Sequence, residues 1–192
     1  MTRLGVEFYD RPARVVARDL LGKILARRVD GVVRRARVIE TEAYVGEHDL
    51  ASHARFGRTP RNASMWGPPG RAYVYLVYGM HHCLNVVTSA EGDPQAVLLR
   101  AAEALDGWEA RLGGPALLAK AFGLTRKDDG ADLLGDAVWL QEGARPTRIA
   151  TTPRIGVGYA GTWANKRLRF AVVPQARNRR PFKPPPPGRK RG

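Results

Sequence analysis

The residues best suited to chemistry gather in one stretch, between Arg37 and Tyr78. It holds two carboxylates two residues apart, Glu40 and Glu42, together with His53 and several arginine and tyrosine side chains. A carboxylate can take a proton from water and can stabilise a developing positive charge on a sugar. When flat aromatic groups and positive charge surround it, such a carboxylate suits hydrolytic work on a nucleobase.

The two glutamates lie on a predicted strand. Residues 23–29 and 32–39 flank an Asp-Gly pair, which is a strong β-hairpin signal, and the second strand continues to Tyr44. With a period of two, Glu40, Glu42 and Tyr44 would point to one face. Either these acids belong to a site, or they lie on a solvated edge strand and meet surface arginines. The pattern itself does not choose between Glu40 and Glu42.

Residues 45–72 are predicted to form a long loop, because glycines and prolines interrupt them repeatedly. A loop of this length inside a compact domain is usually functional or disordered. Its arginines, among them Arg58 and Arg61, suit contacts with phosphate groups. His53 taken alone would ordinarily be a solvated or capping histidine.

An aromatic strand over 73–78 is followed by a second strand over 83–88, which predicts a hairpin with Tyr78 and Met80 near its tip. An exposed tyrosine there is a candidate wedge for a base stack. The alternative is that these tyrosines only pack against the sheet. No metal site is expected from the His81, His82 and Cys83 run, since adjacent residues on an extended chain point to opposite faces.

The remaining elements are predicted from periodicity and from helix-breaking residues. Helices are expected from about Pro12 to Gly22 and over 107–124, the second interrupted near Pro115. Further short strands are expected over 96–99, 137–140 and 168–173. The glycine-rich run 153–161 lacks the setting of a phosphate-binding loop and suggests close approach of backbone to a ligand.

Composition sets the bounds on this protein. A chain of 192 residues with 44% hydrophobic content suits one domain, expected over 1–175. The net charge of +14 predicts a polyanionic partner, either nucleic acid or an acidic membrane surface. Residues 176–192 carry seven of the positive charges and no acid, which leaves 14 − 7 = +7 on the rest, and this proline-rich tail is predicted to be disordered.

Compartment is indicated by what the sequence lacks. The single Cys83 excludes an internal disulfide and is compatible with a reducing compartment. There is no apolar run long enough to cross a bilayer and no signal-peptide pattern at the N-terminus. We therefore expect a soluble, cytoplasmic protein with no membrane partner.

Six segments in chain order are similar to the motifs of the alkyladenine (3-methyladenine) DNA glycosylase family. They are V-I-E-T-E-A-Y, A-S-H-A-R-F-G-R-T-P-R-N, Y-V-Y-L-V-Y-G-M-H-H-C-L-N-V-V-T, V-L-L-R-A, G-P-A-L-L-A-K-A-F-G-L and R-I-G-V-G-Y-A-G-T-W-A-N-K-R-L-R-F. The match covers about residues 5–173. It implies an α/β fold in the α+β sense, with a curved, mostly antiparallel sheet, surrounding helices and a protruding hairpin that intercalates into DNA.

The resemblance also implies an activity. A monofunctional enzyme of base excision repair would flip a damaged purine out of duplex DNA and hydrolyse its N-glycosidic bond with water. It would leave an abasic site, need no cofactor or metal and act as a monomer. The expected substrates are 3-methyladenine, 7-methylguanine, hypoxanthine and ethenoadenine. Alkylation at a ring nitrogen makes the base cationic, and a cation over an aromatic face gains roughly 0.5–2 kcal/mol.

Individual roles follow from matching positions. The resemblance implies that Glu42 activates the water, that Arg100 lies near that water and the target phosphate, and that the Ile155 carbonyl helps to hold the water. The resemblance further implies that Tyr44, His53, Tyr75 and Asn85 form the pocket for the flipped base and that Tyr78 intercalates into the DNA. Contacts with the DNA backbone are expected from Arg58, Arg61 and Met80. His81 departs from the aromatic residue that some relatives carry after the Tyr-Gly-Met tip.

Two other functions remain open at this stage. A non-catalytic nucleic-acid-binding domain would account for the charge and the aromatic strands, but not for Glu42 beside a tyrosine and histidine pocket. A different transferase on the same architecture is also possible, because a fold does not determine a function.

Overall fold

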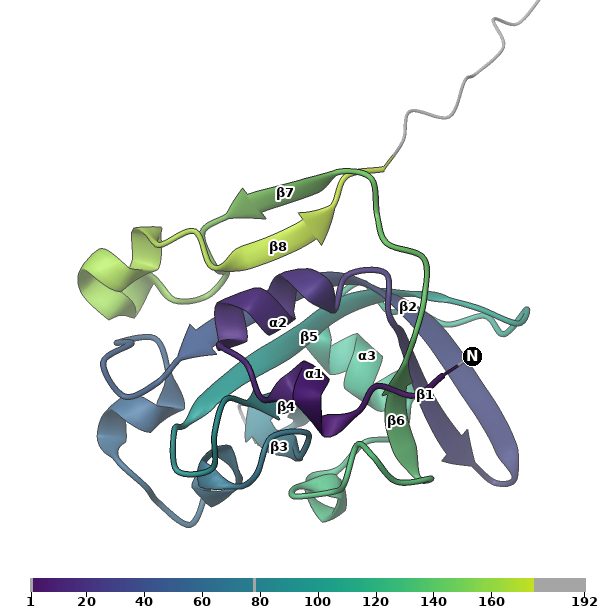
Figure 1. Cartoon of the computed structure of the whole chain (residues 1–192), viewed down its shortest axis with the longest axis horizontal. Helices are drawn as coiled ribbons and strands as arrows, with labels where there is room; N and C mark the ends of the chain where they lie inside the picture. Colours follow the sequence, from purple (N-terminus) through teal and green to yellow (C-terminus); the bar gives the residue numbers. More distant parts are fainter. Residues whose placement is uncertain (1, 78, 175–192) are drawn as a thin grey trace, which may run out of the picture.

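Eight antiparallel strands form one curled sheet, and the helices and loops pack around it (Figure 1). The computed structural model describes residues 2–77 and 79–174. The strands are β1 (Ile24–Val29), β2 (Val32–Val45), β3 (Ala72–Val77), β4 (His81–Thr88), β5 (Gln95–Ala104), β6 (Val138–Gln141), β7 (Ile149–Thr152) and β8 (Arg169–Val172). Their order is β3-β4-β5-β2-β1-β6, and β8 pairs with both β2 and β7. The expected single-domain α+β fold with a curved antiparallel sheet is confirmed.

Strand β2 is the spine of this sheet. Its 14 residues pair with β1, β5 and β8, so it meets three neighbours along its length. The pairing with β5 shifts register between Val38 and Thr41, on either side of Glu40. A bulge of this kind bends a strand and increases its twist. Glu42 therefore lies just beyond the bend, on the segment that faces β5 on one edge and β8 on the other.

Helices cover the sheet and bury its apolar positions. The helices are α1 (Val6–Tyr9), α2 (Ala13–Asp19) and α3 (Pro115–Ala121), with 3-10 turns η1 (His53–Phe56), η2 (Ala63–Trp66), η3 (Arg126–Asp128) and η4 (Gly158–Asn165). In the view of Figure 1, α2 lies in front of the sheet and α3 behind it. The Thr41 hydroxyl donates to the Ala17 carbonyl over 2.7 Å, which ties α2 to β2.

The predicted hairpin is confirmed. Strands β3 and β4 pair from Ala72 with Val86 to Val77 with His81, and the Met80 amide donates to the Val77 carbonyl over 3.1 Å to close the turn. Gly79 has a φ of +69°, a left-handed conformation that glycine adopts at low cost. Tyr78, the predicted wedge, lies outside the described residues.

The predicted helix over 107–124 was wrong in its first half. Only Pro115–Ala121 is helical, and the preceding residues run irregularly beside the sheet. The Leu112 carbonyl accepts from the Ala102 amide over 3.1 Å, and the Trp108 indole donates to the Arg35 carbonyl over 2.7 Å. These hydrogen bonds to β5 and β2 replace the local pattern of a helix.

Other boundaries also differ from expectation. The helix predicted from about Pro12 to Gly22 is the shorter α2, at Ala13–Asp19. The strand predicted over 96–99 is the longer β5, at Gln95–Ala104. Strand β7 and the four 3-10 turns carried no periodic signal, because each is too short to show one. Among the described residues, no helix is long and apolar enough to span a membrane. The predicted tail, 176–192, lies outside the described residues.

Candidate active site

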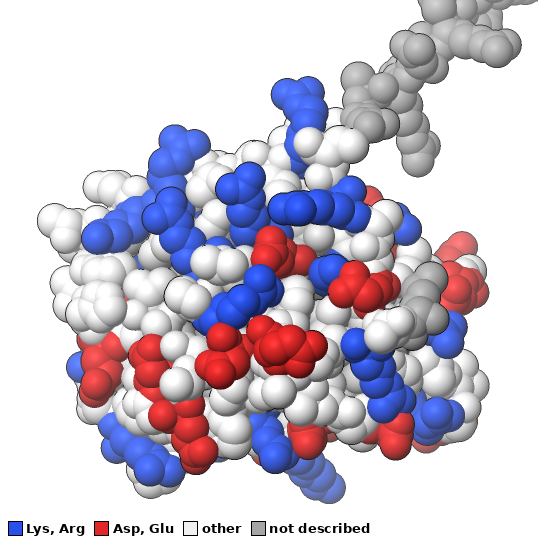
Figure 2. All heavy atoms as spheres, viewed as in Figure 1, with Lys and Arg blue, Asp and Glu red and all other residues white. Residues whose placement is uncertain are grey.

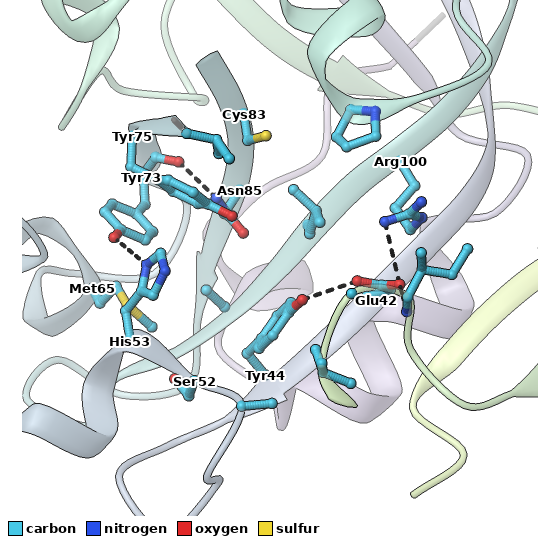
Figure 3. A pocket seen from close by; sticks show the side chains of 18 of the residues that line it. Glu42, Tyr44, Ser52, His53, Met65, Tyr73, Tyr75, Cys83, Asn85 and Arg100 are labelled. Carbon is cyan, nitrogen blue, oxygen red and sulfur yellow. Dashed lines mark hydrogen bonds and ion pairs between the residues drawn. The ribbon is translucent and has the colours of Figure 1, made fainter. Parts of the chain in front are cut away.

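A cavity of about 560 Å³ opens where the end of β2 meets β5, the β3–β4 hairpin and two loops (Figure 3). One loop follows β2 and carries η1, and the other precedes η4. In Figure 3, Glu42 and Arg100 lie on one side of the cavity and His53, Tyr73 and Tyr75 on the other, with Tyr44 between them. Residues that lie more than a hundred positions apart in the sequence, such as Glu42 and Ile155, therefore line the same cavity.

Glu42 is fully buried and is held by two hydrogen bonds and an ion pair. Its Oε1 accepts the Ile155 backbone N–H over 2.8 Å and lies 3.4 Å from Nη1 of Arg100. Its Oε2 accepts the Tyr44 hydroxyl over 2.9 Å. The geometry fixes the orientation of the carboxylate, because both of its oxygens are engaged from different elements.

The ionisation of Glu42 is opposed by its surroundings. Burial raises the pKa of Glu42 above its ordinary value, while the charge on Arg100 and the hydrogen bonds from Ile155 and Tyr44 lower it without cancelling the rise. A carboxylate with a raised pKa is a better proton acceptor than an exposed one. Perturbed carboxylates in cavities are typical of functional sites.

The neighbouring Glu40 has a different environment. Its Oε1 accepts from Nε of Arg100 over 2.8 Å and from Nε of Arg169 over 2.5 Å. Burial would raise the pKa of Glu40, but the hydrogen bonds and charges of the two arginines outweigh it and lower that pKa. Glu40 is thus an ion-pair partner that holds Arg100, whereas Glu42 faces the cavity. Of the two glutamates, only Glu42 lines the cavity.

Aromatic rings form the opposite wall of the cavity. The His53 ring lies edge-on to Tyr75, with 4.5 Å between ring centres, and Tyr73 and Tyr75 are tilted at 5.3 Å. His53 Nδ1 lies 2.8 Å from the Tyr73 hydroxyl, a hydrogen bond that fixes the ring. Tyr44 lines the same cavity as this wall, so a flat ligand in the cavity would meet aromatic rings.

The histidine in this wall is uncharged at neutral pH. Burial, helped by the charges of Arg61 and Arg55, lowers the pKa of His53 to about 4. Burial also raises the pKa of the Cys83 thiol to about 11, so the thiol is protonated. Neither group adds charge to the cavity, so among the described residues that line it Glu42 is the carboxylate and Arg61 and Arg100 are the cations.

Asn85 completes the cavity floor on β4. Its side chain is buried and its Nδ2 donates to the Tyr73 carbonyl over 3.1 Å. This bond orients the Asn85 amide from the paired strand. The structure therefore brings five of the predicted site residues together around one cavity: Glu42, Tyr44, His53, Tyr75 and Asn85.

Comparison with known proteins agrees with this geometry. The family model described as methylpurine-DNA glycosylase (MPG) matches residues 7–176. The chain belongs to the methylpurine-DNA glycosylase family. It is accordingly an enzyme of the DNA glycosylase class, a hydrolase acting on N-glycosyl bonds.

Curated relatives are similar over most of the chain. A protein of Anaeromyxobacter dehalogenans is 54% identical over 172 residues, covering 88% of this chain and 82% of its own. A protein of Myxococcus xanthus is 49% identical and is covered almost end to end, 100% of this chain and 99% of its own. A protein of Methanocella arvoryzae is 46% identical over 88% of this chain and 92% of its own. All three are provisionally named 3-methyladenine DNA glycosylases.

The predicted DNA contacts of this family member lie outside the cavity or at its rim. Arg58 and Arg61 are exposed on the loop between η1 and η2, and Arg61 also lines the cavity and donates to the Leu76 carbonyl over 2.9 Å. Met80 is 71% exposed at the hairpin turn. All three side chains are exposed to solvent, and Arg61 is the one that also lines the cavity.

Four residues at the site were missed from the sequence. They are Tyr73, which binds His53; Arg169, which binds Glu40; and the ion pair of Arg154 and Asp49. Arg154 precedes the predicted Ile155, so a charged residue beside that position was the available signal. Nothing local distinguishes Asp49 from the other acids of its loop. In the part of the chain that the structure describes, no three His, Cys, Asp or Glu side chains are grouped to hold a metal ion.

Proposed function

We propose that this protein is a monofunctional glycosylase that removes alkylated or deaminated purines, of the class that includes 3-methyladenine, 7-methylguanine, hypoxanthine and ethenoadenine, from duplex DNA. One observation carries the proposal: a fully buried carboxylate, Glu42, is held at the end of a cavity walled by aromatic rings. The product would be an abasic site. The relatives provisionally named as 3-methyladenine DNA glycosylases support this substrate class.

In this proposal Glu42 is the general base. It takes a proton from a water molecule as that water attacks C1′ of the flipped nucleotide, and its negative charge stabilises the oxocarbenium-like sugar. Because its oxygens are already bound by Tyr44 and Ile155, little reorganisation is needed at the moment of reaction. Arg100, held by Glu40, would lie beside the water and the target phosphate, and the Ile155 carbonyl would help to hold that water.

The aromatic wall is the proposed recognition element. A purine stacked between Tyr44 and the rings of His53 and Tyr75 presents its face to their π systems, which favours a cationic alkylated base. The neutral state of His53 matters here, because a charged imidazole would repel such a base. Asn85 would crowd the exocyclic amino group of guanine. A volume of about 560 Å³ falls within the roughly 300–1,000 Å³ that is usual for small-ligand pockets.

The hairpin and the loop arginines are the proposed DNA contacts. Flipping a nucleotide costs a few kcal/mol of stacking and pairing, so a side chain has to fill the gap. We assign this role to Tyr78, and Met80 would contact the DNA backbone. Arg58 and Arg61 would bind phosphates near the cavity mouth. The protein would act as a monomer.

The experiment uses a labelled duplex that contains one hypoxanthine, incubated with the full chain and then treated with alkali. We expect strand cleavage only after alkali, because water is the nucleophile and the backbone is left intact. Glu42→Gln keeps the shape of the side chain but removes the base, and should slow excision by at least about 100-fold. Its affinity for the duplex, measured by fluorescence anisotropy, should be unchanged.

Glu40→Gln is the matched control, since Glu40 lies on the same strand and also pairs with Arg100, but it pairs with Arg169 and does not line the cavity. We expect a smaller effect on excision from Glu40→Gln than from Glu42→Gln. Tight, salt-sensitive binding of wild-type protein without excision of any alkylated or deaminated purine would replace the glycosylase proposal with a non-catalytic binding domain.

A further inference from the structure

A buried ion pair lies next to the elements that hold Glu42. Nη1 and Nη2 of Arg154 donate to the two carboxylate oxygens of Asp49 over 2.5 and 2.8 Å. Both side chains are 0% exposed. A buried pair of this kind contributes little net stability, because removing two charges from water offsets most of their attraction. Its placement is therefore better explained by what it holds in position.

Arg154 connects the loop after β7 with the strand that carries Glu42. Besides binding Asp49, its Nη1 donates to the Ala43 carbonyl over 2.9 Å. Its guanidinium lies 4.7 Å from the centre of the Tyr44 ring. Ala43 and Tyr44 directly follow Glu42 in β2, so the arginine grips the strand immediately beyond the carboxylate.

Asp49 connects Arg154 to the loop that follows β2 and leads to His53. Its Oδ2 accepts from the Val45 amide over 3.2 Å, and its Oδ1 accepts from the Ala51 amide over 3.0 Å. Ala51 lines the cavity and begins the segment that leads to His53. The ion pair thus joins β2, the loop that carries His53 and the loop that carries Ile155.

The consequence reaches Glu42 through its two neutral hydrogen-bond donors. The Ile155 N–H, which donates to Glu42 over 2.8 Å, belongs to the residue next to Arg154. The Tyr44 hydroxyl, which donates over 2.9 Å, belongs to the ring beneath the Arg154 guanidinium. If Arg154 moved, both donors would lose their support, while Arg100 would stay bound to Glu40.

We propose that Arg154 and Asp49 form a positioning pair, whose bidentate contact holds the Ile155 amide and the Tyr44 hydroxyl on Glu42 and so maintains the orientation and the ionised form that a general base requires. This inference rests on the proposed function of Glu42. Neither member of the pair touches the substrate. The positive charge of Arg154 also lowers the pKa of Glu42, which acts in the same direction as the two hydrogen bonds.

The first test is Arg154→Lys in the hypoxanthine duplex assay. Lysine keeps the positive charge but cannot bind both Asp49 oxygens and the Ala43 carbonyl with one planar group. We expect the single-turnover excision rate at the pH plateau to fall about 10- to 100-fold, as small misplacements of catalytic groups do. Duplex affinity should be unchanged. Arg3→Lys, at the solvent-exposed pair with Asp136, is the control and should have the wild-type rate.

The second test is the double variant Asp49→Asn/Arg154→Met, which removes both buried charges together. It should melt at a higher temperature than Arg154→Met alone, because no unpaired charge remains buried. Its excision rate should stay low, and the acid limb of its pH–rate profile should move to higher pH, because the Ile155 and Tyr44 donors that lower the pKa of Glu42 are no longer held on it. A pair with only a structural role would regain rate and melting temperature together.

A cooperative thermal melt first shows that each variant is folded. The excision rate and pH profile of either folded variant then test the positioning role. Wild-type rate and pH profile in a folded Arg154→Lys or double variant would overturn the positioning role. Absence of excision by the wild-type protein of any alkylated or deaminated purine, hypoxanthine included, would overturn the proposed function instead. The two failures are therefore distinct.

Discussion

At the residue scale, the two glutamates of β2 show how environment separates two identical side chains. Glu40 is bound by Arg100 and Arg169, which lower its pKa, whereas burial raises the pKa of Glu42. A glutamate with a lowered pKa is a weak proton acceptor at neutral pH. This difference supports the proposed acid–base role of Glu42, in which Glu40 would fix Arg100.

The raised pKa of Glu42 predicts the pH dependence of excision. A general base works only when ionised, so the rate should fall as pH drops through the Glu42 pKa, with a midpoint above the ordinary 4.5. Tyr44→Phe removes a hydrogen bond that favours the ionised form, so this limb should move to still higher pH. Single-turnover rates measured between pH 4.5 and 8 provide the test.

His53→Gln serves as the control for that assignment. The pKa of His53 is already lowered to about 4, so its titration does not explain a limb that lies at higher pH. The limb should keep its midpoint in His53→Gln, even if base binding weakens. A midpoint that followed His53 and ignored Tyr44→Phe would reassign the titrating group.

At the scale of elements, the β3–β4 hairpin depends on protection of its outer edge. Strand β3 is the last strand of the sheet, and unpaired edges need covering. Residues 129–131 provide this cover: the Ala72 amide donates to the Ala131 carbonyl, and Asp129 accepts from the Val74 amide, each near 2.9 Å. Asp129 also accepts from the Ser64 hydroxyl over 2.9 Å, which links the hairpin to η2.

Asp129→Ala should therefore loosen the hairpin. It leaves the Val74 amide without its partner at a buried edge, which costs about 1–3 kcal/mol of unfolding free energy. For a chain of this size, the melting temperature should fall by roughly 2–4 °C per kcal/mol. Calorimetry gives the stability, and anisotropy with duplex DNA should show weaker binding.

Asp136→Ala is the matched control for that change. Asp136 pairs with Arg3 at the surface, where its side chain is 82% exposed, and such pairs contribute about 0–1 kcal/mol. Its melting temperature should stay near that of the wild type. Equal losses in the two variants would show that Asp129 is no more than another surface acid.

At the scale of the whole molecule, charge is distributed unevenly. Figure 2 shows Lys and Arg side chains gathered along the β7–β8 edge of the face in view, while acidic and basic side chains mix elsewhere on it. Of the formal +14, residues 176–192 contribute seven positive charges, so the rest of the chain carries 14 − 7 = +7. Binding to DNA should therefore depend on salt through both parts.

Removal of residues 176–192 should weaken DNA binding and reduce its salt dependence. Each phosphate contact that is lost lowers the slope of log K against log salt by about 0.9. The single-turnover excision rate at saturating protein should not change, since the proposed catalytic groups all lie on residues 42–155. Anisotropy titrations at several salt concentrations measure the slope.

A full-length chain with the seven Lys and Arg of this segment changed to Gln separates charge from length. It should match the truncated protein in affinity and slope. If its slope equals that of the wild type, the charge of this segment does not contribute to DNA binding. The salt dependence of binding would then come from residues 1–175 alone.

What the sequence determined by itself was local pattern and family. The Asp-Gly turn, the aromatic strand 73–78 and the run to Tyr44 predicted hairpins, because strand period and turn chemistry are short-range properties. Six ordered motifs indicated the glycosylase family and, through it, the position of Glu42 and its neighbours. The pattern failed where a segment is ordered by distant partners, as in 107–114, whose hydrogen bonds go to β2 and β5.

Only the tertiary structure decided how the candidate groups differ in charge and support. Glu40 and Glu42 are equivalent in a strand pattern, but burial raises the pKa of Glu42, whereas the hydrogen bonds and charges of Arg169 and Arg100 lower the pKa of Glu40. The Arg154–Asp49 pair, separated by 105 positions, was equally invisible in the sequence. Such contacts depend on how β2 bends and on which loops pack against it, and no local spacing encodes either.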